Sequence, residues 1–245
     1  MLKIEGRNPV IELLRSKRYI KRIMLEEGIN EKDEKISEII KRARNRSITI
    51  EYTAKKQLVR FSDTKNHQGV IALALIGFED LGEVITEQRR HKNPLNFVYI
   101  REALYEDNIG AIARSVEAAG FTGVILSPKQ NLTAQMFRSS MGALANVTIC
   151  RESLFTAIKL CQKELIQVVG IELFTENIFT EVDLVPDTML IIGGEDRSLS
   201  PEIMKKCDTV VKIPMYGKIN SLNMTVAASI VVFEKLRQVR SRISS

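Results

Sequence analysis

Three polar segments of the sequence carry side chains that could hold or polarise a substrate: residues 101–120, 191–202 and 212–236. The side chains that stand out in them are Asn108, Arg114, Glu195, Ser221 and Asn223. Amide, hydroxyl and guanidinium groups donate hydrogen bonds to oxygen atoms, and arginine suits phosphate in particular. No group of His, Cys and Asp residues has metal-ligand spacing, so we expect no metal site. The expected chemistry therefore depends on binding and positioning a polar substrate.

The chain from Leu95 onward alternates between strands and helices, and this alternation predicts the frame that positions the three segments. Near-continuous apolar runs separated by helices are typical of a parallel sheet covered on both faces. Such sheets bind ligands beyond the carboxyl ends of their strands, where all three segments lie. The predicted strands are Asn96–Ile100, Gly123–Leu126, Val168–Leu173, Thr188–Ile192 and Thr209–Ile213. The predicted helices are Asn108–Ala119, Ser153–Lys163, Pro201–Lys206 and Ser221–Arg237.

The same residues also have purely structural explanations. Asp107 or Asn108 can cap the first helix, and Arg114 falls roughly 150° from its apolar stripe, as an ordinary exposed arginine does. The paired glycines of the second segment let a ligand approach the backbone, or simply make a tight turn. Ser221 or Asn220 can cap the last helix. Each segment by itself is therefore a weak signal.

Positive charge is concentrated in the first part of the chain. Residues 1–75 include 17 basic and 10 acidic residues, whereas the remainder includes 19 basic and 20 acidic residues. A concentrated basic field fits a nucleic-acid phosphate backbone, and it also fits a solvated surface. The same residues alternate helical and extended patterns, which predicts a small α/β unit. The polar stretch 77–93, followed by Pro94, predicts a linker between two domains.

Composition and motifs exclude several classes of protein. No stretch approaches about 18 uninterrupted apolar residues, so we expect no membrane span. The N-terminus lacks signal-peptide features and the three cysteines lack C-x-x-C spacing, so we expect a cytoplasmic protein with cysteines as core residues. A nicotinamide dehydrogenase is not expected, because no G-x-G-x-x-G follows any strand, and the Walker A lysine pattern is missing too.

Taken in order, the three segments resemble the motifs of the SpoU (TrmH-like) family of RNA ribose methyltransferases. The first is similar to N-x-G-x-x-x-R, the second to G-x-E…L-S, and the third to I-P-M…S-L-N. Two N-terminal sequences, G-R-N-P-V and N-H-Q-G-V, resemble the family's separate substrate-binding domain. The matching residues are Asn108, Gly110, Arg114, Gly193, Glu195, Leu199, Ser200, Ile213, Pro214, Met215, Ser221, Leu222, Asn223, Gly6–Val10 and Asn66–Val70.

The resemblance implies an α/β protein with two domains. Residues 1–76 would form an L30e-like RNA substrate-binding domain, and residues 77–94 would form a linker. Residues 95–245 would form a SPOUT-type parallel α/β domain with a deep C-terminal trefoil knot, an exception to the rarity of knots. The resemblance also implies a homodimer whose interface helps to build the site. The implied cofactor is S-adenosyl-L-methionine.

The resemblance further implies roles for individual residues. Those expected to bind the cofactor are Gly193, Gly194, Ile213, Met215 and Leu222. Those expected in catalysis are Asn108, Arg114, Glu195, Ser221 and Asn223. Arg114 is expected to engage the ribose hydroxyl and the adjacent phosphate, because an arginine essentially never deprotonates in a protein. The three residues Asn108, Glu195 and Asn223 would orient Arg114 and the ribose.

Four positions depart from the family pattern. Tyr105 and Glu106 stand where members usually have Asp-Pro, and Asp196 and Ser198 stand where members have glycine. These changes bring charge and bulk near a ligand-binding loop, so they bear on substrate specificity more than on fold. The expected substrate is a guanosine ribose in 23S ribosomal RNA, because the extra N-terminal domain favours a large structured target. The alternatives are a tRNA ribose and a non-catalytic RNA-binding protein that retains the fold.

Overall fold

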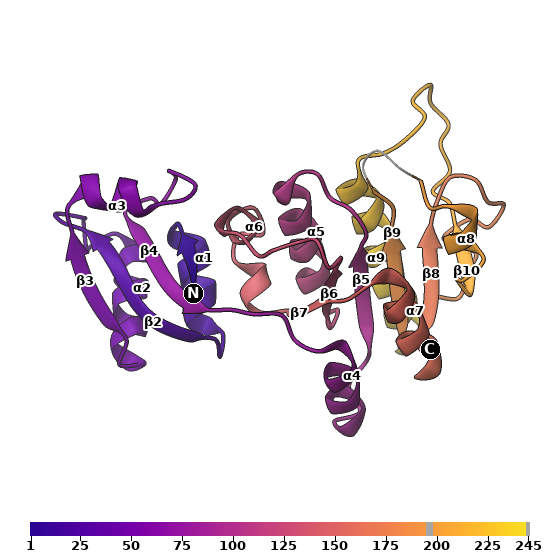
Figure 1. Ribbon diagram of the computed structural model, residues 1–245, viewed down its shortest axis with the longest axis horizontal. Helices are drawn as coiled ribbons and strands as arrows, with labels where there is room; N and C mark the ends of the chain where they lie inside the picture. The colour runs from indigo at the N-terminus through magenta and orange to yellow at the C-terminus, as the bar shows by residue number, and fades with distance from the viewer. Residues whose placement is uncertain (195–197, 244–245) are drawn as a thin grey trace. The chain divides into compact units, whose positions relative to one another are not determined.

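The computed structural model describes residues 1–194 and 198–243, and the chain divides into two compact units (Figure 1). The first unit contains Met1–Gly77 together with Asn131–Asn146. The second contains Phe78–Gln130 together with Val147–Ser245. Each unit has its own β-sheet. No helix in the described part of the chain is long and apolar enough to cross a membrane.

The first unit is built on a four-stranded sheet with the order β1-β4-β2-β3. Strands β2 and β3 are parallel, and the other neighbours are antiparallel. Asp33 accepts hydrogen bonds from the amides of Lys35 and Ile36, so α2 begins at Glu34. The strands are β1 (Leu2–Glu5), β2 (Tyr19–Glu26), β3 (Thr49–Thr53) and β4 (Val70–Leu75). The helices are α1 (Arg7–Arg15), α2 (Glu34–Asn45) and α3 (Lys55–Phe61).

A segment from the middle of the chain completes the first unit. Residues 131–146 contribute α6 (Ala134–Ser139) and the short 3-10 helix η1 (Ala143–Ala145). Gly142 has a φ of +95°, and a Cβ atom there would lie 2.6 Å from Cβ of Glu12 and 2.9 Å from Cα of Pro9. Glycine is needed at this position both for its backbone conformation and for the close approach to α1. Chain order alone gave no sign that this segment packs with the N-terminal residues.

The second unit is built on a six-stranded sheet with the order β10-β8-β9-β5-β6-β7, in which every neighbouring pair is parallel. The predicted strands β5, β6 and β9 have the predicted bounds, β8 and β10 end two residues early, and β7 was not predicted. The strand order reverses between β5 and β9, which makes this the switch point of the sheet. The strands are β5 (Asn96–Ile100), β6 (Gly123–Leu126), β7 (Thr148–Arg151), β8 (Gln167–Ile171), β9 (Thr188–Ile192) and β10 (Thr209–Val211).

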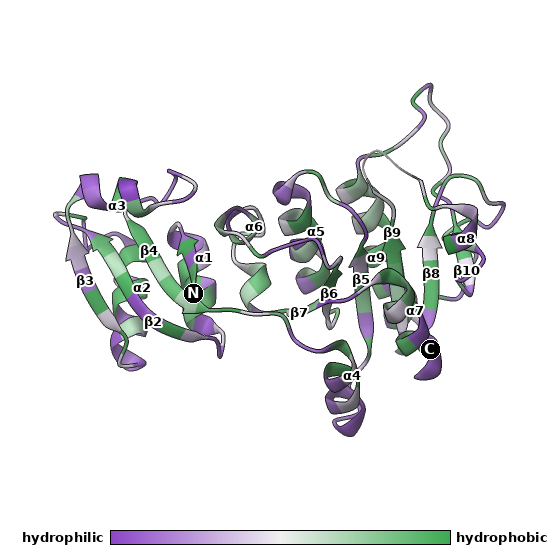
Figure 2. Cartoon of the chain, in the orientation of Figure 1, coloured by the Kyte–Doolittle hydropathy of each residue, from purple (hydrophilic) through white to green (hydrophobic). Residues whose placement is uncertain are grey.

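Helices cover this sheet on both faces. One face packs against α4 and α7, whose apolar side chains share a core with Phe97 and Tyr99 of β5. On the other face α5 and α9 lie together, and Oγ of Ser115 lies 2.8 Å from Oγ of Ser229. Figure 2 shows β8 and β9 as hydrophobic over most of their length, as expected for strands covered on both sides. The helices are α4 (Leu81–Arg90), α5 (Glu106–Ala118), α7 (Leu154–Lys163), α8 (Pro201–Met204) and α9 (Met224–Ile243).

Helix α4 lies inside the stretch that was expected to be a linker. Asp80 caps it by accepting a hydrogen bond from the amide of Glu83 at 2.9 Å. Leu81, Val84 and Ile85 are buried in the core of the second unit. Its polar remainder made the stretch resemble a linker, but three buried side chains at helical spacing make it part of the fold.

Lys235 of α9 is a buried charge that holds the helix to the segment before β9. Its side chain is only 1% exposed, and Nζ donates to the carbonyl oxygens of Leu184 and Pro186, both at 2.6 Å. Nζ also donates to Oγ1 of Thr188 at 3.2 Å. Burial lowers the pKa of Lys235 to about 8. The ammonium group therefore depends on these oxygen atoms in place of water.

We expect Lys235→Met to lower the free energy of unfolding by about 2 kcal/mol, because two buried carbonyl oxygens lose their donor. Urea denaturation measures this, with the exposed Lys163→Met of α7 as the control. The unfolded chain holds the lysine proton more tightly than the folded one. The stability of the wild type relative to Lys235→Met should therefore rise between about pH 8 and pH 10.5. A difference that stays flat or falls across this range would contradict the assignment.

Candidate functional site

A pocket of about 610 Å³ lies at the carboxyl edge of the six-stranded sheet. It is lined by residues that follow four neighbouring strands, β5, β9, β8 and β10, and it therefore spans the switch point of the sheet. This is the position at which open parallel sheets bind ligands. The lining residues are Tyr105, Asn108, Ile171, Glu172, Leu173, Phe174, Ile192, Gly193, Gly194, Ser198, Ile213, Met215, Asn220, Ser221, Leu222, Asn223, Met224 and Ala227.

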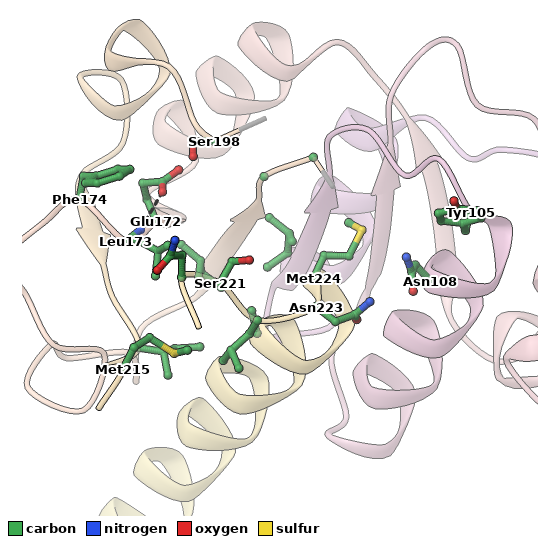
Figure 3. Close-up of a pocket in the computed structure, with 18 residues that line it drawn as sticks. Tyr105, Asn108, Glu172, Leu173, Phe174, Ser198, Met215, Ser221, Asn223 and Met224 are labelled. Atoms are coloured by element: carbon green, nitrogen blue, oxygen red, sulfur yellow. Dashed lines mark hydrogen bonds between the residues drawn. The ribbon is translucent and has the colours of Figure 1, made fainter. Parts of the chain in front are cut away.

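The polar side of the pocket is formed by the first turns of α5 and α9. Oγ1 of Thr225 donates to Oδ1 of Asn108 at 3.1 Å, and Oδ1 of Asn223 accepts from the amide of Thr225 at 2.8 Å. Figure 3 shows Asn108 and Asn223 next to each other across these two helix ends. The residue that caps α9 is therefore Asn223 rather than the expected Ser221 or Asn220. Two amide side chains that are far apart in the sequence are held together by one threonine.

Helix α5 also begins earlier than expected. Its first residue is Glu106, and Tyr105 occupies the position before it without a side-chain cap hydrogen bond. Neither Asp107 nor Asn108 is the cap, because both lie within the first turn. The side chain of Asn108 is consequently available on the pocket side, where it accepts the hydrogen bond from Thr225.

The apolar side of the pocket contains all five residues expected to bind the cofactor. They come from the ends of β9 and β10 and from the segment before α9, and they are Gly193, Gly194, Ile213, Met215 and Leu222. Backbone without side chains at the end of β9 and aliphatic side chains on the facing wall suit a flat, largely apolar ligand with a few polar groups. The structure thus brings together residues spread over 30 positions of the chain.

Sequence reasoning missed the segment that follows β8. Glu172 is only 7% exposed, and its carboxylate accepts hydrogen bonds from the amides of Leu173 at 2.7 Å and Leu199 at 2.6 Å. It therefore ties the end of β8 to the residues that follow β9. Phe174 lines the same pocket and is largely exposed. The rule used for the other segments, polar residues directly after a parallel strand, did not select Glu172, because the strand was predicted to run to Leu173 and so included it.

We expect Glu172→Gln to weaken binding of S-adenosylmethionine by about 10-fold, since the amide keeps only one acceptor oxygen for two buried N–H groups. Isothermal titration calorimetry measures the affinity. Glu176→Gln is the matched control, because the Glu176 side chain is fully solvated and, among the described residues, pairs with Lys212 alone, at 3.4 Å. Equal affinities for Glu172→Gln and the wild type would show that the carboxylate does not organise the pocket.

One expected catalytic residue, Arg114, does not line this pocket, and another, Glu195, lies outside the described residues. Arg114 lies exposed on α5 and does not line it. Six residues separate Arg114 from Asn108, which corresponds to about 240° around a helix, so the two side chains leave α5 on different faces. Its guanidinium makes no hydrogen bond to the described residues of this chain. Glu195 lies outside the described residues, as does Asp196.

Two of the positions that depart from the family pattern lie at the pocket. Tyr105 lines it and is 67% exposed. Ser198 lines it as well, and its carbonyl oxygen accepts a hydrogen bond from Arg101 at 3.2 Å. In Figure 3 Ser198 lies above Glu172, and Tyr105 lies at the opposite end of the pocket. The sequence departures therefore concern the two ends of the pocket rather than its apolar wall.

Comparison with known families decides the class of the protein. Residues 96–233 match the model of the SpoU rRNA Methylase family. The chain belongs to this family. Residues 3–74 match a second model, RNA 2′-O ribose methyltransferase substrate binding. The SpoU match covers every strand of the parallel sheet and every described residue of the pocket.

Members of the family resemble this chain over nearly its whole length. A protein of Staphylococcus aureus assigned to the TrmH family of tRNA/rRNA methyltransferases is 32% identical over 96% of this chain and 95% of its own. An uncharacterized tRNA/rRNA methyltransferase of Mycolicibacterium smegmatis is also 32% identical, over 96% of this chain and 76% of its own. The chain is therefore a SpoU family RNA methyltransferase.

Solved structures share the fold. The SpoU methyltransferase AviRb from Streptomyces viridochromogenes superposes with a TM-score of 0.82 at 22% identity, covering 98% of this chain and 90% of its own. An AdoMet-bound rRNA methyltransferase from Sinorhizobium meliloti superposes with a TM-score of 0.80 at 21% identity, covering 97% of this chain and 87% of its own. At 22% and 21% identity, these two structures show that this chain shares their fold.

Proposed function

We propose that this protein transfers a methyl group from S-adenosylmethionine to the 2′-hydroxyl of a ribose in structured RNA. The observation that carries the proposal is the pocket at the switch point of the parallel sheet, which gathers residues of all three sequence motifs. Its volume of about 610 Å³ falls in the range of small-molecule sites. Its combination of bare backbone, aliphatic wall and a few amide and carboxylate groups fits the cofactor. The bound cofactor supplies an electrophilic methyl group on a sulfonium.

The chain's own residues would hold the reactants in line. Gly193, Ile213 and Leu222, with Gly194 and Met215 beside them, would contact the cofactor on the apolar side. The polar groups that would orient the ribose are Asn108, Ser221 and Asn223, and Glu195 is proposed for the same task from its motif position. The hydrogen bonds through Thr225 support this, because they fix Asn108 and Asn223 before any substrate arrives.

Arg114 would act across a homodimer. Its guanidinium is exposed and lies outside its own chain's pocket, so it would anchor phosphate and stabilise the developing oxyanion in the site of another copy. Helix α9, which packs against the helix α5 that carries Arg114, also exposes apolar side chains, among them Val226 and Phe233, which are 46% and 45% exposed. A two-fold dimer through these helices would give each pocket an arginine from the partner subunit.

The proposed target is a guanosine of 23S ribosomal RNA. Support comes from the basic first unit, which adds a second RNA-binding surface. Among the compared structures, an rRNA methyltransferase covers 97% of this chain, whereas two with tRNA in their descriptions cover 65% and 61%. A tRNA ribose is the second candidate, because the relatives of similar length carry both RNA classes in their names.

The proposed organisation follows the family. Residues 1–76 would bind the RNA as an L30e-like domain, and residues 95–245 would form the SPOUT-type domain with its trefoil knot. Residues 77–94 would be the linker between these two domains. The knot is supported by the meeting of three loops in one pocket, those after β8, β9 and β10. Helix α4, which lies within the proposed linker, contributes to the core of the second unit. The segment 131–146, which lies within the proposed SPOUT-type domain, belongs to the first unit.

Transfer of tritium from labelled S-adenosylmethionine to rRNA and, separately, to tRNA tests the proposal. We expect label in rRNA, resistance of the modified linkage to alkaline cleavage, and loss of label with Arg114→Ala. Label in tRNA alone would replace the proposed target. If the protein binds the cofactor but transfers no label to naked RNA, the substrate would be the ribosomal precursor particle, and the transfer is then measured with that particle. Failure to bind the cofactor at all would instead favour a non-catalytic RNA-binding protein.

A further inference from the structure

The first unit contains a cavity of its own, separate from the methyl-transfer pocket. It has a volume of about 900 Å³ and lies beside the turn after β1, the start of α2 and the loop before β4. Nothing in the proposed reaction uses these residues. Those that line it are Arg7, Glu26, Gly28, Ile29, Asp33, Glu34, Lys35, Lys55, Lys65, Asn66, His67, Gln68 and Gly69.

His67 is the buried polar side chain of this cavity. It is only 6% exposed, and its Nδ1 accepts a hydrogen bond from the amide of Gly69 at 3.0 Å. Because Nδ1 is the acceptor, the proton of the neutral ring must be on Nε2. Nε2 has no hydrogen-bond partner among the described residues, and it is not among the side-chain atoms sealed away from solvent. A buried ring that lines the cavity therefore keeps one N–H donor without a partner among the described residues.

Arg7 is held in place at the same cavity. Its Nε donates to the carbonyl oxygen of Gln68 at 3.3 Å, and its NH1 donates to Asp33 at 2.8 Å. The side chain of Gln68 in turn accepts from the backbone amide of Arg7 at 3.1 Å. A guanidinium fixed by two partners loses little conformational entropy when it binds a ligand with its remaining N–H groups.

The loop that carries His67 is strained and firmly anchored. Lys65, Gln68 and Gly69 all have positive φ values, of 58°, 53° and 80°. For the first two, which are not glycine, this conformation is costly. The buried carboxylate of Glu5 offsets this conformational cost by anchoring the start of the loop. It accepts hydrogen bonds from the amides of Asp63 at 2.6 Å and Thr64 at 3.2 Å, and from the hydroxyl groups of Ser62 and Thr64. Strain that the fold maintains in this way is typical of binding sites.

The free groups of the cavity are mainly donors. The exposed ammonium groups of Lys35 and Lys65 form no ion pair with the described residues. Two of the three carboxylates are already engaged, since Asp33 binds Arg7 and Glu26 lies 3.7 Å from Lys55. A ligand that matches an imidazole N–H, a guanidinium and two ammonium groups must offer several acceptor oxygens with negative charge. Phosphate oxygens have this character.

We propose that this cavity binds a phosphate and its nucleotide from an unpaired segment of the RNA, with His67 and Arg7 as the hydrogen-bond donors. The proposal rests on the proposed function, because it assumes that RNA is the substrate. An unpaired strand can project one nucleotide into a concave site, whereas the phosphates of a duplex stay on its convex surface. Lys35 and Lys65 flank the phosphate and add the salt-dependent part of the binding.

Two substitutions of His67 separate the donor from the structural acceptor. In His67→Asn the side-chain oxygen can replace Nδ1 and accept from Gly69, but the Nε2 donor is lost. In His67→Gln the amide nitrogen can replace Nε2, but the acceptor for Gly69 is lost. Binding of an unstructured fluorescein-labelled RNA of about 12 nucleotides to the full chain is measured by fluorescence anisotropy, and stability by thermal denaturation.

We expect His67→Asn to bind the RNA about 10-fold more weakly with a Tm close to that of the wild type. We expect His67→Gln to bind the RNA nearly as well but to melt at a lower temperature. Lys65→Ala should reduce the slope of log affinity against log salt concentration by about 0.7. A purely structural histidine would give the reverse order, with His67→Gln the weaker binder, and this result would overturn the proposal. Absence of RNA binding by the wild type, or equal binding of a duplex of the same length, would overturn it as well.

The two proposals fail in different ways. Tritium transfer reports on the methyl-transfer pocket, whereas anisotropy without cofactor reports on the cavity of the first unit. RNA binding that depends on His67 in a protein without transfer activity would reject the enzyme and leave the cavity assignment in place. Normal methyl transfer together with unaltered RNA binding by His67→Asn would reject the cavity assignment and leave the proposed enzyme activity in place.

Discussion

Arg114→Ala is expected to lower kcat/KM for methyl transfer to RNA by about 10³-fold, the cost of removing one well-placed group that stabilises an oxyanion. The affinity for S-adenosylmethionine should stay unchanged, because Arg114 does not line the pocket of its own chain. Single-turnover transfer of labelled methyl at saturating cofactor measures the first quantity, and calorimetry measures the second. Arg90→Ala is a suitable control, since Arg90 is an exposed arginine on α4 that forms an ion pair with Glu87 of its own helix.

Mixing two inactive variants tests whether Arg114 acts in the partner's pocket. One variant is Arg114→Ala, and the other is Ala227→Trp, which blocks the pocket but retains Arg114. In a random mixture half of the dimers contain one chain of each kind. If Arg114 acts across the interface, each of these has one complete site, and about a quarter of the wild-type activity returns. If Arg114 acts within its own chain, no site is complete and the mixture stays inactive.

A near-normal turnover of Arg114→Ala would remove this residue from the mechanism altogether. Loss of cofactor binding in the same variant would instead mean that the arginine supports the pocket rather than the RNA. Both outcomes are separable from unfolding by the thermal stability of the variant, which should match the wild type because Arg114 is exposed and outside the core.

Ala227→Trp is expected to reduce the affinity for S-adenosylmethionine by more than about 100-fold. Ala227 lines the pocket from the first turns of α9, directly beside the apolar wall. An indole at this position would occupy space that the ligand needs, and a packed wall cannot retreat without strain. Calorimetric titration with the cofactor measures the loss.

The matched control is Ala118→Trp, the same change at an exposed position near the end of α5 that does not line the pocket. It should bind the cofactor as the wild type does. The two variants together distinguish a blocked pocket from a general effect of tryptophan on helix stability. If Ala227→Trp binds the cofactor normally, the ligand occupies a different cavity, and the assignment of Gly193, Ile213 and Leu222 as contact residues is wrong.

Much of the second unit could be predicted from the sequence because its signals are local. Continuous apolar runs of β-branched residues mark strands that are buried on both faces, and three of them were predicted with their observed bounds, Asn96–Ile100, Gly123–Leu126 and Thr188–Ile192. Helix ends were less predictable, because several polar residues compete for each cap. In α9 the competition among Asn220, Ser221 and Asn223 is decided by geometry rather than by residue type.

The sequence also placed the polar segments at strand ends, and with them five residues that line one wall of the pocket. It gave no warning of Glu172, because a single carboxylate after a strand looks like any surface acid until its two amide partners are known. The position of Arg114 relative to the pocket was also not evident from the sequence. A motif lists residues along a chain, but only the helical phase relative to Asn108 reveals that the arginine faces away from its own pocket.

The sequence by itself determined the class of fold, the alternation of strands and helices along the chain, and the family motifs. These features depend on short-range patterns of apolar and polar residues. Tertiary structure alone decided the contacts between distant segments. It attached residues 131–146 to the first unit, packed helix α4 of the expected linker into the core of the second unit, and buried Lys235 among carbonyl oxygens. Such contacts join residues tens of positions apart, and their energies depend on burial and geometry that no local pattern records.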